Sequence, residues 1–188
     1  MVFAGALALC GCATAPGEPA SGFIAPQIAE AYIPLKATRF LDKHFGAAVV
    51  IAPGVAVTNA HNANLVDPAS VIGVAQGYDL LFFRTEKSAA AATAAPRTGE
   101  AVIAYGQGAD GLRQSRGVVE KFWPAAFGFE SDAGPGFSGG PVVDAKTGAL
   151  LGITYGFIDQ GGKRLMLAYS ISFVMEEWAK IQTAKASL

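Results

Sequence analysis

A serine stands among glycines in the segment Gly-Pro-Gly-Phe-Ser-Gly-Gly-Pro at positions 134–141, and two valines follow it. Nucleophilic attack on an amide needs an activated oxygen close to N–H groups that bind the negative charge developing on the carbonyl oxygen. Ser138 can supply that oxygen. Gly136 has no Cβ, so its N–H can turn inward beside the N–H of Ser138. The segment therefore predicts a nucleophile and an oxyanion hole formed by the backbone of Gly136 and Ser138.

A serine nucleophile needs a base, and the chain contains two histidines, His44 and His61. His61 ends the apolar segment VAVTNAH at 55–61, which delivers an imidazole to the end of a strand behind a small alanine. His44 stands between Lys43 and Phe45 without such a context, so we interpret it as a residue without a catalytic role. His61 is the candidate base.

The third member of such a site is a carboxylate that fixes the imidazole tautomer and stabilises the imidazolium. Asp79 is the best candidate, because it precedes four large apolar residues at 80–83 and a lone acid in that position needs a partner. The alternative for Asp79 is a structural role in a turn after Gly77. Asp67, which precedes Pro68 only six residues after His61, is the weaker candidate acid.

The segments 58–61, 79–81 and 136–141, in that order, resemble a trypsin-like (chymotrypsin-fold) serine protease of the bacterial type. The resemblance is dispersed over positions 45–178. It implies an all-β fold of two six-stranded antiparallel β-barrels with a C-terminal helix. His61 and Asp79 would then come from the first barrel and Ser138 from the second, with the active site between them.

Two further segments fit the same resemblance. Residues 102–122 are similar to the middle of the second barrel of bacterial high-temperature-requirement proteases, and residues 152–156 are similar to the strand that binds substrate backbone. The resemblance therefore implies substrate binding by Thr154, Tyr155 and Gly156, and a hydrogen bond from Thr154 to Asp79. It also implies a specificity role for Asp132, which lies six residues before Ser138, where trypsin-like enzymes place the acid that pairs with substrate Arg or Lys.

The alternative for Asp132 is a solvated turn, with Met166 and Leu167 narrowing the pocket to small apolar side chains. Two other features depart from the family: the spacing from His61 to Asp79 is short, and Phe137 stands where vertebrate-type trypsins place an activating Asp. We therefore expect no activation by insertion of a new N-terminus.

The pattern of short apolar runs agrees with an all-β fold. Runs rich in Val, Ile, Phe and Tyr recur between Gly, Pro, Asn and Asp residues. Helical periodicity is confined to 173–185, where Val174, Trp178 and Ile181 share one face, Ser172 is a candidate N-cap, and Glu176 can pair with Lys180. The expected strands are 47–52, 55–59, 70–75, 80–85, 101–105, 118–122, 141–144 and 150–155.

The motif Gly-x-Ser-x-Gly at 136–140 is also the nucleophile elbow of α/β-hydrolases. That fold needs a histidine after the serine, and no histidine follows Ser138. It also needs a helix after the serine, whereas Gly-Gly-Pro-Val-Val breaks a helix and begins a strand. Chain order therefore excludes this alternative.

The composition limits the setting. The chain has 188 residues, 52% of them hydrophobic, and a formal net charge of −1. This length suits one catalytic unit: a first barrel over 36–88, an alanine-rich linker over 89–96, and a second barrel with the closing helix over 97–188. Scattered Lys and Arg predict no nucleic-acid partner, and two histidines without a cysteine pair in the body predict no metal site and no cofactor. The expected partner is a protein or peptide substrate.

The N-terminal residues 1–12 form an apolar run that is too short to span a bilayer but suits a signal-peptide core. Leu9-Cys10-Gly11-Cys12 resembles a bacterial lipoprotein box with Cys12 as the lipidated residue; Cys10 fits less well because Leu9 would occupy a small-residue position. No Lys or Arg precedes Lys36, so we expect the natural start to lie further upstream. Residues 13–35 predict a flexible tether. The expected location is the bacterial cell envelope, attached to the membrane by this lipid anchor.

These features predict a serine endopeptidase that hydrolyses peptide bonds through an acyl-enzyme. Ser138 is the nucleophile, His61 the base and then the acid, and Asp79 orients His61. The alternative from another class is a non-catalytic module that has the protease fold and holds a peptide as an added strand along 154–156. Labelling of Ser138 by a fluorophosphonate distinguishes the two.

Overall fold

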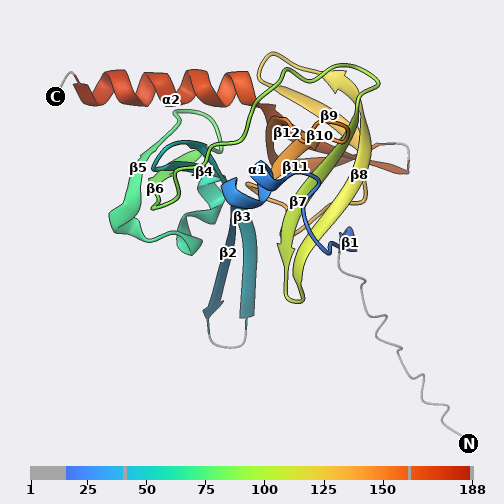
Figure 1. Cartoon of the computed structure of the whole chain (residues 1–188), viewed down its shortest axis with the longest axis horizontal. Coiled ribbons are helices and arrows are strands. Elements are labelled where there is room, and N and C mark those ends of the chain that lie inside the picture. Colours follow the sequence, from blue (N-terminus) through green and yellow to red (C-terminus); the bar gives the residue numbers. More distant parts are fainter. Residues whose placement is uncertain (1–15, 40–41, 161, 187–188) are drawn as a thin grey trace, which may run out of the picture.

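The structure, a computed structural model, describes residues 16–39, 42–160 and 162–186. Its described part consists of two antiparallel sheets and a long C-terminal helix (Figure 1). One sheet closes into a barrel and the other is an open sheet packed beside it. This is the chymotrypsin-like all-β fold that the sequence predicts. All eight expected strands are present, and four of them are longer than expected: the strand expected at 47–52 begins at Asp42, that at 101–105 ends at Gly108, that at 118–122 begins at Gly111, and that at 150–155 ends at Gln160.

The closed barrel contains six strands in the order β8-β7-β10-β11-β12-β9, and β9 pairs back onto β8. Gly117 makes this closure possible, because a Cβ at that position would lie 2.3 Å from the carbonyl oxygen of Glu130 on β9. A short outer strand, β1, is added to β8. The strands are β1 (Glu18–Pro19), β7 (Ala101–Gly108), β8 (Gly111–Phe122), β9 (Ala126–Glu130), β10 (Pro141–Asp144), β11 (Leu150–Gln160) and β12 (Lys163–Ser170).

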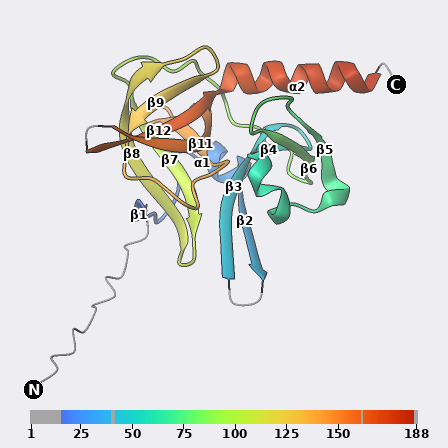
Figure 2. The ribbon, with the colours of Figure 1, turned by 180° about the vertical axis from the view of Figure 1, so that it is seen from behind.

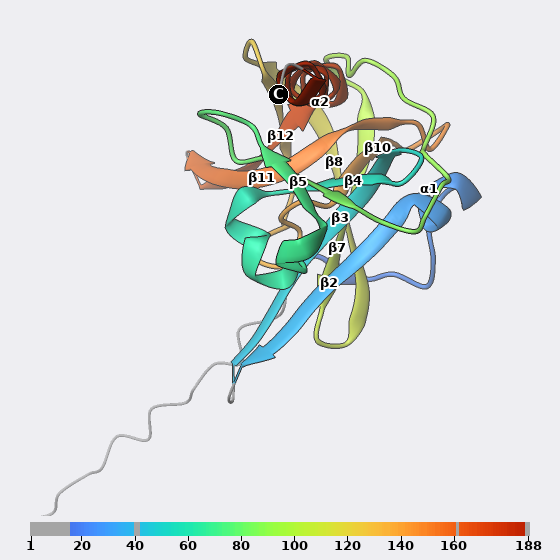
Figure 3. The ribbon, with the colours of Figure 1, turned by 90° about the vertical axis from the view of Figure 1, so that its left-hand side faces the viewer.

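The open sheet has five described strands in the order β2-β3-β4-β6-β5, rather than the six that the resemblance implies. The short connection between β4 and β6 explains the difference, since it holds two 3₁₀ helices and one strand. The strands are β2 (Tyr32–Arg39), β3 (Asp42–Ala52), β4 (Val55–Thr58), β5 (Val71–Val74) and β6 (Leu81–Arg84), and the 3₁₀ helices are η1 (Ala60–Leu65) and η2 (Pro68–Ser70). The hairpins β2–β3 and β7–β8 project in the same direction from the two sheets (Figures 1 and 3).

The pairing of β4 with β6 positions two of the candidate catalytic residues. These strands are antiparallel, and Thr58 lies opposite Leu81. The end of β4 therefore meets the start of β6, so that His61 and Asp79 emerge at the same edge of the sheet.

The N-terminal part of the chain corrects one expectation. Of the predicted flexible tether at 13–35, residues 16–35 belong to the fold: they form β1, helix α1 (Pro26–Ala31) and the start of β2. The reason is burial, because Ile28 and Ala31 are fully buried in the core that the two sheets share. Cys10, Cys12 and the signal region at 1–12 lie outside the described residues.

Helix α2 (Ile171–Ala186) closes the chain and lies across the open sheet (Figure 2). The expected apolar face is confirmed: Val174 and Trp178 are buried, and the Trp178 ring lies 5.5 Å from that of Phe82 on β6. The helix begins earlier than predicted because Ser170, rather than Ser172, accepts the N–H of Phe173 at 3.4 Å.

The ion pair on this helix also differs from the prediction. Lys180 contacts Glu177 at 2.6 Å, one position along from the expected Glu176. Glu177 is only 4% exposed, so a paired lysine reduces the cost of burying its charge.

Candidate active site

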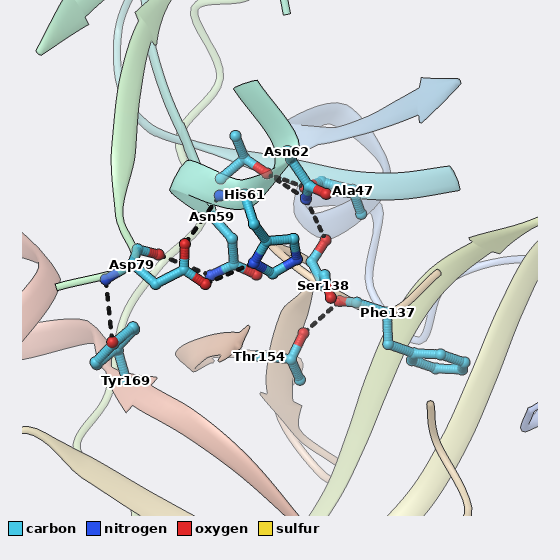
Figure 4. A network of polar contacts seen from close by, with 10 residues as sticks. Ala47, Asn59, His61, Asn62, Asp79, Phe137, Ser138, Thr154 and Tyr169 are labelled. Carbon is cyan, nitrogen blue, oxygen red and sulfur yellow. Dashed lines mark hydrogen bonds and ion pairs between the residues drawn. The ribbon is translucent and has the colours of Figure 1, made fainter. Parts of the chain in front are cut away.

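His61 and Asp79 form the most complete part of the site. The Nδ1 atom of His61 lies 2.6 Å from Oδ2 of Asp79, and the backbone N–H of His61 donates to Oδ1 at 2.9 Å. The carboxylate thus fixes both the backbone and the ring of the histidine. With Nδ1 facing the carboxylate, Nε2 is the ring nitrogen left to act as a base. In Figure 4 the imidazole lies between Asp79 and Ser138.

The backbone of Asp79 is held from two sides. Its N–H donates to the hydroxyl of Tyr169 at 3.2 Å, and its carbonyl accepts from Nδ2 of Asn59 at 3.0 Å. The Tyr169 ring stacks on Tyr155 with centroids 4.1 Å apart. Burial raises the pKa of Tyr169 above its ordinary value, so its hydroxyl stays neutral beside the carboxylate. The closed barrel therefore helps to position an acid of the open sheet.

The two weaker candidates lie elsewhere. Asp67 caps η2 by accepting the N–H of Ala69 at 3.0 Å, which is a structural role. His44 is exposed on β3 and makes no side-chain hydrogen bond within the described residues. The structure therefore brings His61, rather than His44, together with Asp79.

The turn at 134–137 precedes the nucleophile. The N–H of Phe137 donates to the carbonyl of Gly134 at 3.0 Å, and Gly136 has a φ of 93°. Pro135 in the second position and a positive φ in the third are the signature of a type II turn. A Cβ at Gly136 would lie 2.3 Å from the carbonyl oxygen of Gln107, so only glycine fits. We call residues 134–137 the oxyanion turn.

The backbone donors around Ser138 divide into two sets. The N–H groups of Phe137, Gly139 and Gly140 donate to the carbonyls of Gly134, Thr154 and Phe137. Within the described part of the chain, the N–H groups of Gly136 and Ser138 have no acceptor. The Ser138 hydroxyl likewise has no hydrogen-bond partner there. These uncommitted groups are the ones that attack on a carbonyl and binding of its oxyanion require.

Asn62, the residue after His61, links the open sheet to the nucleophile. Its Nδ2 donates to the carbonyl of Ser138 and to Oγ1 of Thr58, both at 3.0 Å. The Thr58 hydroxyl donates to the carbonyl of Ala47 at 2.7 Å, and the Ala47 N–H donates to the Ser138 carbonyl at 2.9 Å. These four contacts form a closed ring (Figure 4). Gly46 makes room for it, because a Cβ there would lie 2.7 Å from Nδ2 of Asn62.

A hollow beside Ser138 is the candidate substrate pocket. Its lining includes Tyr155 and Gly156, which the sequence predicts to bind substrate, as well as Met166. The strand pairing of β11 with β12 shifts register between Thr154 and Gly156, so Tyr155 is left out of the ladder. The hollow is lined by Gly134, Pro135, Ser138, Thr154, Tyr155, Gly156, Phe157 and Met166.

Thr154 and Asp132 are placed differently from their expected roles. The Thr154 hydroxyl is buried within reach of the carbonyls of Phe137 and Gly140, so the expected hydrogen bond to Asp79 is wrong. Asp132 is exposed, accepts a hydrogen bond from Ser115 and is not among the residues that line the hollow beside Ser138. It lines a separate charged hollow with Arg116, Glu130 and Lys163.

Four residues that position the site were not assigned a role from the sequence: Thr58, Asn59, Asn62 and Tyr169. Polar residues directly after the apolar run 55–57 were the available signal for Thr58 and Asn59, whereas Asn62 stands among other polar residues. Tyr169 carried no such signal, because its partner Asp79 lies 90 residues away.

Among the described residues, no group of three His, Cys, Asp or Glu side chains is placed to hold a metal ion. None of their helices combines the length and the apolar character that crossing a membrane requires.

Comparison with known proteins gives a consistent result for the fold. No family model and no curated protein sequence matches the chain. Among solved structures, the active form of the Rv3671c protease from M. tuberculosis superposes with a TM-score of 0.68 at 18% identity, covering 83% of this chain and 84% of that one. The serine endoprotease from Yersinia pestis gives 0.69 at 16% identity, covering 87% and 68%.

The HtrA-type protease AlgW, solved with a decapeptide, gives a TM-score of 0.63 at 19% identity, covering 85% of this chain and 67% of that one. Likeness at such identities shows the fold. The chain thus has a chymotrypsin-like fold, and its structural neighbours are serine proteases of the trypsin-like and HtrA types.

Proposed function

We propose that the chain is a serine endopeptidase with Ser138, His61 and Asp79 as its catalytic triad. Nε2 of His61 takes the proton of the Ser138 hydroxyl as its oxygen bonds to the substrate carbonyl carbon. The imidazolium then gives this proton to the leaving amine as the C–N bond breaks, which leaves an acyl-enzyme. Water hydrolyses the ester by the same proton transfers in reverse order.

The observation that carries this proposal is the division of hydrogen bonds around the site. The His61–Asp79 pair is fully formed at 2.6 Å, whereas the hydroxyl of Ser138 and the N–H groups of Gly136 and Ser138 have no partner in the described part of the chain. A site built only for stability would be expected to satisfy such groups internally. An enzyme leaves them for the substrate and stabilises the oxyanion with them.

A peptide substrate fits along 154–156. The register shift at Tyr155 interrupts the ladder between β11 and β12 beside Ser138, and an extended peptide would add there as a strand, with one side chain entering the hollow that Met166 lines. The HtrA-type protease AlgW, which has this fold, was solved with a decapeptide, which supports a peptide as the class of ligand.

The test is labelling of the full chain by a fluorophosphonate, with Ser138→Ala and His61→Ala as controls. The proposal expects stoichiometric labelling that both variants lose. A well-folded protein that binds peptides but is not labelled would instead be a peptide-binding module. Hydrolysis that persists in Ser138→Ala would assign the chemistry to another residue.

We further propose that Cys12 is lipidated and anchors the protein in the bacterial cell envelope. The support is the lipobox-like sequence at 9–12 and the apolar run before it. Replacing Cys12 by Ser in the full-length precursor should release the protein from the membrane fraction, because the acyl chains supply the affinity. Hydrolysis in solution should not change. An unmodified Cys12 in the mass spectrum of the native protein would contradict this proposal alone.

A further inference from the structure

The segment at residues 16–19 packs directly against the oxyanion turn, although some 115 residues separate the two in sequence. Pro16 lies against Gly134, where an added Cβ would come within 2.9 Å of the proline ring. Gly17 lies against the ring of Phe137, the residue before the nucleophile, where an added Cβ would come within 2.7 Å. We call residues 16–19 the N-terminal brace. It thus contacts both ends of the turn.

Arg113 on β8 holds the brace in place. Its Nε donates to the carbonyl of Pro16 at 2.7 Å and its Nη2 to the carbonyl of Gly17 at 2.6 Å. Its Nη1 pairs with Asp110 at 2.8 Å, and the arginine is only 7% exposed. The planar guanidinium presents its donors in a fixed geometry, so it binds the successive carbonyls of Pro16 and Gly17 at the same time. A buried cation of this kind makes displacement of the brace costly.

Strand pairing extends this contact. Glu18 and Pro19 pair with Gln114 and Arg113, and the N–H of Ala20 donates to the carbonyl of Leu112 at 3.0 Å. Figure 1 shows β1 alongside β8. The brace is therefore held on β8 both by backbone pairing and by the Arg113 side chain.

Gly17 allows the close approach. Its φ is 66°, and a Cβ would lie 2.6 Å from the carbonyl oxygen of Gln114 as well as against Phe137. Gly17 lies at the Cζ end of the Phe137 ring, and Gly106 lies at the other end, where a Cβ would be 2.7 Å from Cγ. Phe137 is only 1% exposed. The brace therefore covers the outer end of the side chain that precedes Ser138.

We propose that the N-terminal brace positions the oxyanion turn, so that the N–H groups of Gly136 and Ser138 point to one place. Displacing the brace frees the outer end of Phe137 and removes the contact at Gly134, and the turn then loses the geometry that its type II form requires. Activity is in this way coupled to the N-terminal segment. This inference deepens the proposed protease function and rests on it.

The test compares two single methyl additions in the full chain. Gly17→Ala places a Cβ against Phe137. Gly22→Ala, just beyond the brace, adds a Cβ that meets nothing within 4 Å. Gly17→Ala should lower kcat about 10- to 100-fold, less than the loss of a whole oxyanion donor, with KM nearly unchanged. Arg113→Gln should act in the same direction, and Gly22→Ala should behave as wild type. Equal kcat in Gly17→Ala and wild type would overturn the proposal.

Amide hydrogen exchange provides a readout that does not need catalysis. In Gly17→Ala and Arg113→Gln, the peptide covering 134–140 should exchange faster than in wild type, while 71–84 in the open sheet should not change. Unchanged exchange at 134–140 would overturn the brace even in an inactive protein. Faster exchange everywhere would show global destabilisation and would also count against it. A wild-type chain without hydrolysis or fluorophosphonate labelling refutes the protease function, and the exchange result still decides the role of the brace.

Discussion

The His61–Asp79 pair and the oxyanion turn handle their hydrogen bonds in opposite ways. Around Asp79, both carboxylate oxygens, the N–H and the carbonyl all have partners. Around Ser138, the hydroxyl and two N–H groups have no partner within the described residues. The first region is held by the protein's own hydrogen bonds, and under the proposed function the second is completed by substrate. Catalysis of acyl transfer needs both, because the base must be oriented before the reaction and the charge stabilised during it.

The two regions meet at the Ser138 carbonyl. It accepts from the Ala47 N–H and from Nδ2 of Asn62, so the open sheet holds the backbone of the nucleophile on the closed barrel. Since Asn62 follows His61 directly, the base and the nucleophile share one rigid connection.

Ser138→Ala and His61→Ala should each abolish turnover almost entirely, because triad members act as a unit and losing one leaves only binding and the oxyanion hole. Folding should survive, since the Ser138 hydroxyl has no partner in the described structure and His61 is exposed at the surface. The measurement is kcat/KM on a peptide substrate with circular dichroism as the folding check. His44→Ala is the control and should retain activity. The opposite pattern for the two histidines would show that His61 is not the base.

Asp79→Asn should lower kcat about 10⁴-fold, because an amide NH₂ facing Nδ1 favours the tautomer that cannot accept the serine proton. The matched control is Asp67→Asn, which removes the charge of the η2 cap and should leave kcat unchanged. Full activity in Asp79→Asn would exclude Asp79 as the orienting acid, and loss of activity in Asp67→Asn alone would assign that role to Asp67.

Asn62→Leu should have a moderate effect on both stability and activity. The side-chain volume is nearly kept, but the donors to the Ser138 carbonyl and to Thr58 are lost. We expect the free energy of unfolding to fall by about 1–3 kcal/mol. We also expect kcat to fall about tenfold, which is less than the roughly 100-fold loss that a misplaced catalytic group can cause. Urea unfolding and steady-state kinetics measure the two.

Asn64→Leu is the control for Asn62→Leu, because Asn64 is an exposed residue of the same 3₁₀ helix. It should change neither quantity. A kcat that stays at the wild-type level in Asn62→Leu, with stability reduced, would show that Asn62 is only structural.

The sequence predicted the fold class and singled out His61, Asp79 and Ser138 as candidates because these signals are encoded locally. Short apolar runs define the strands, and the glycines around Ser138 are required by one turn. The positioning contacts are not local: Tyr169 reaches Asp79 across 90 residues, and Asn62 reaches Ser138 across 76. The N-terminal segment was mistaken for a tether because composition alone hides Ile28, which is fully buried. Such contacts depend on how the two sheets pack, and the periodicity of the sequence carries no information on this packing.

The smallest effects concern the specificity pocket. Met166 lines the hollow beside Ser138 and Asp132 does not, so we expect cleavage after small apolar side chains such as Ala or Val. Met166→Ala enlarges the hollow and should raise kcat/KM for longer apolar side chains about tenfold, the lower end of what one or two methylenes contribute. Asp132→Ala should leave the cleavage profile of a peptide library unchanged, because its carboxylate is exposed and bonded to Ser115. Enrichment of Arg and Lys before the cleaved bond that disappears in Asp132→Ala would instead show that Asp132 contributes to the specificity pocket. It would also mean that substrate binding moves the segment that contains Asp132.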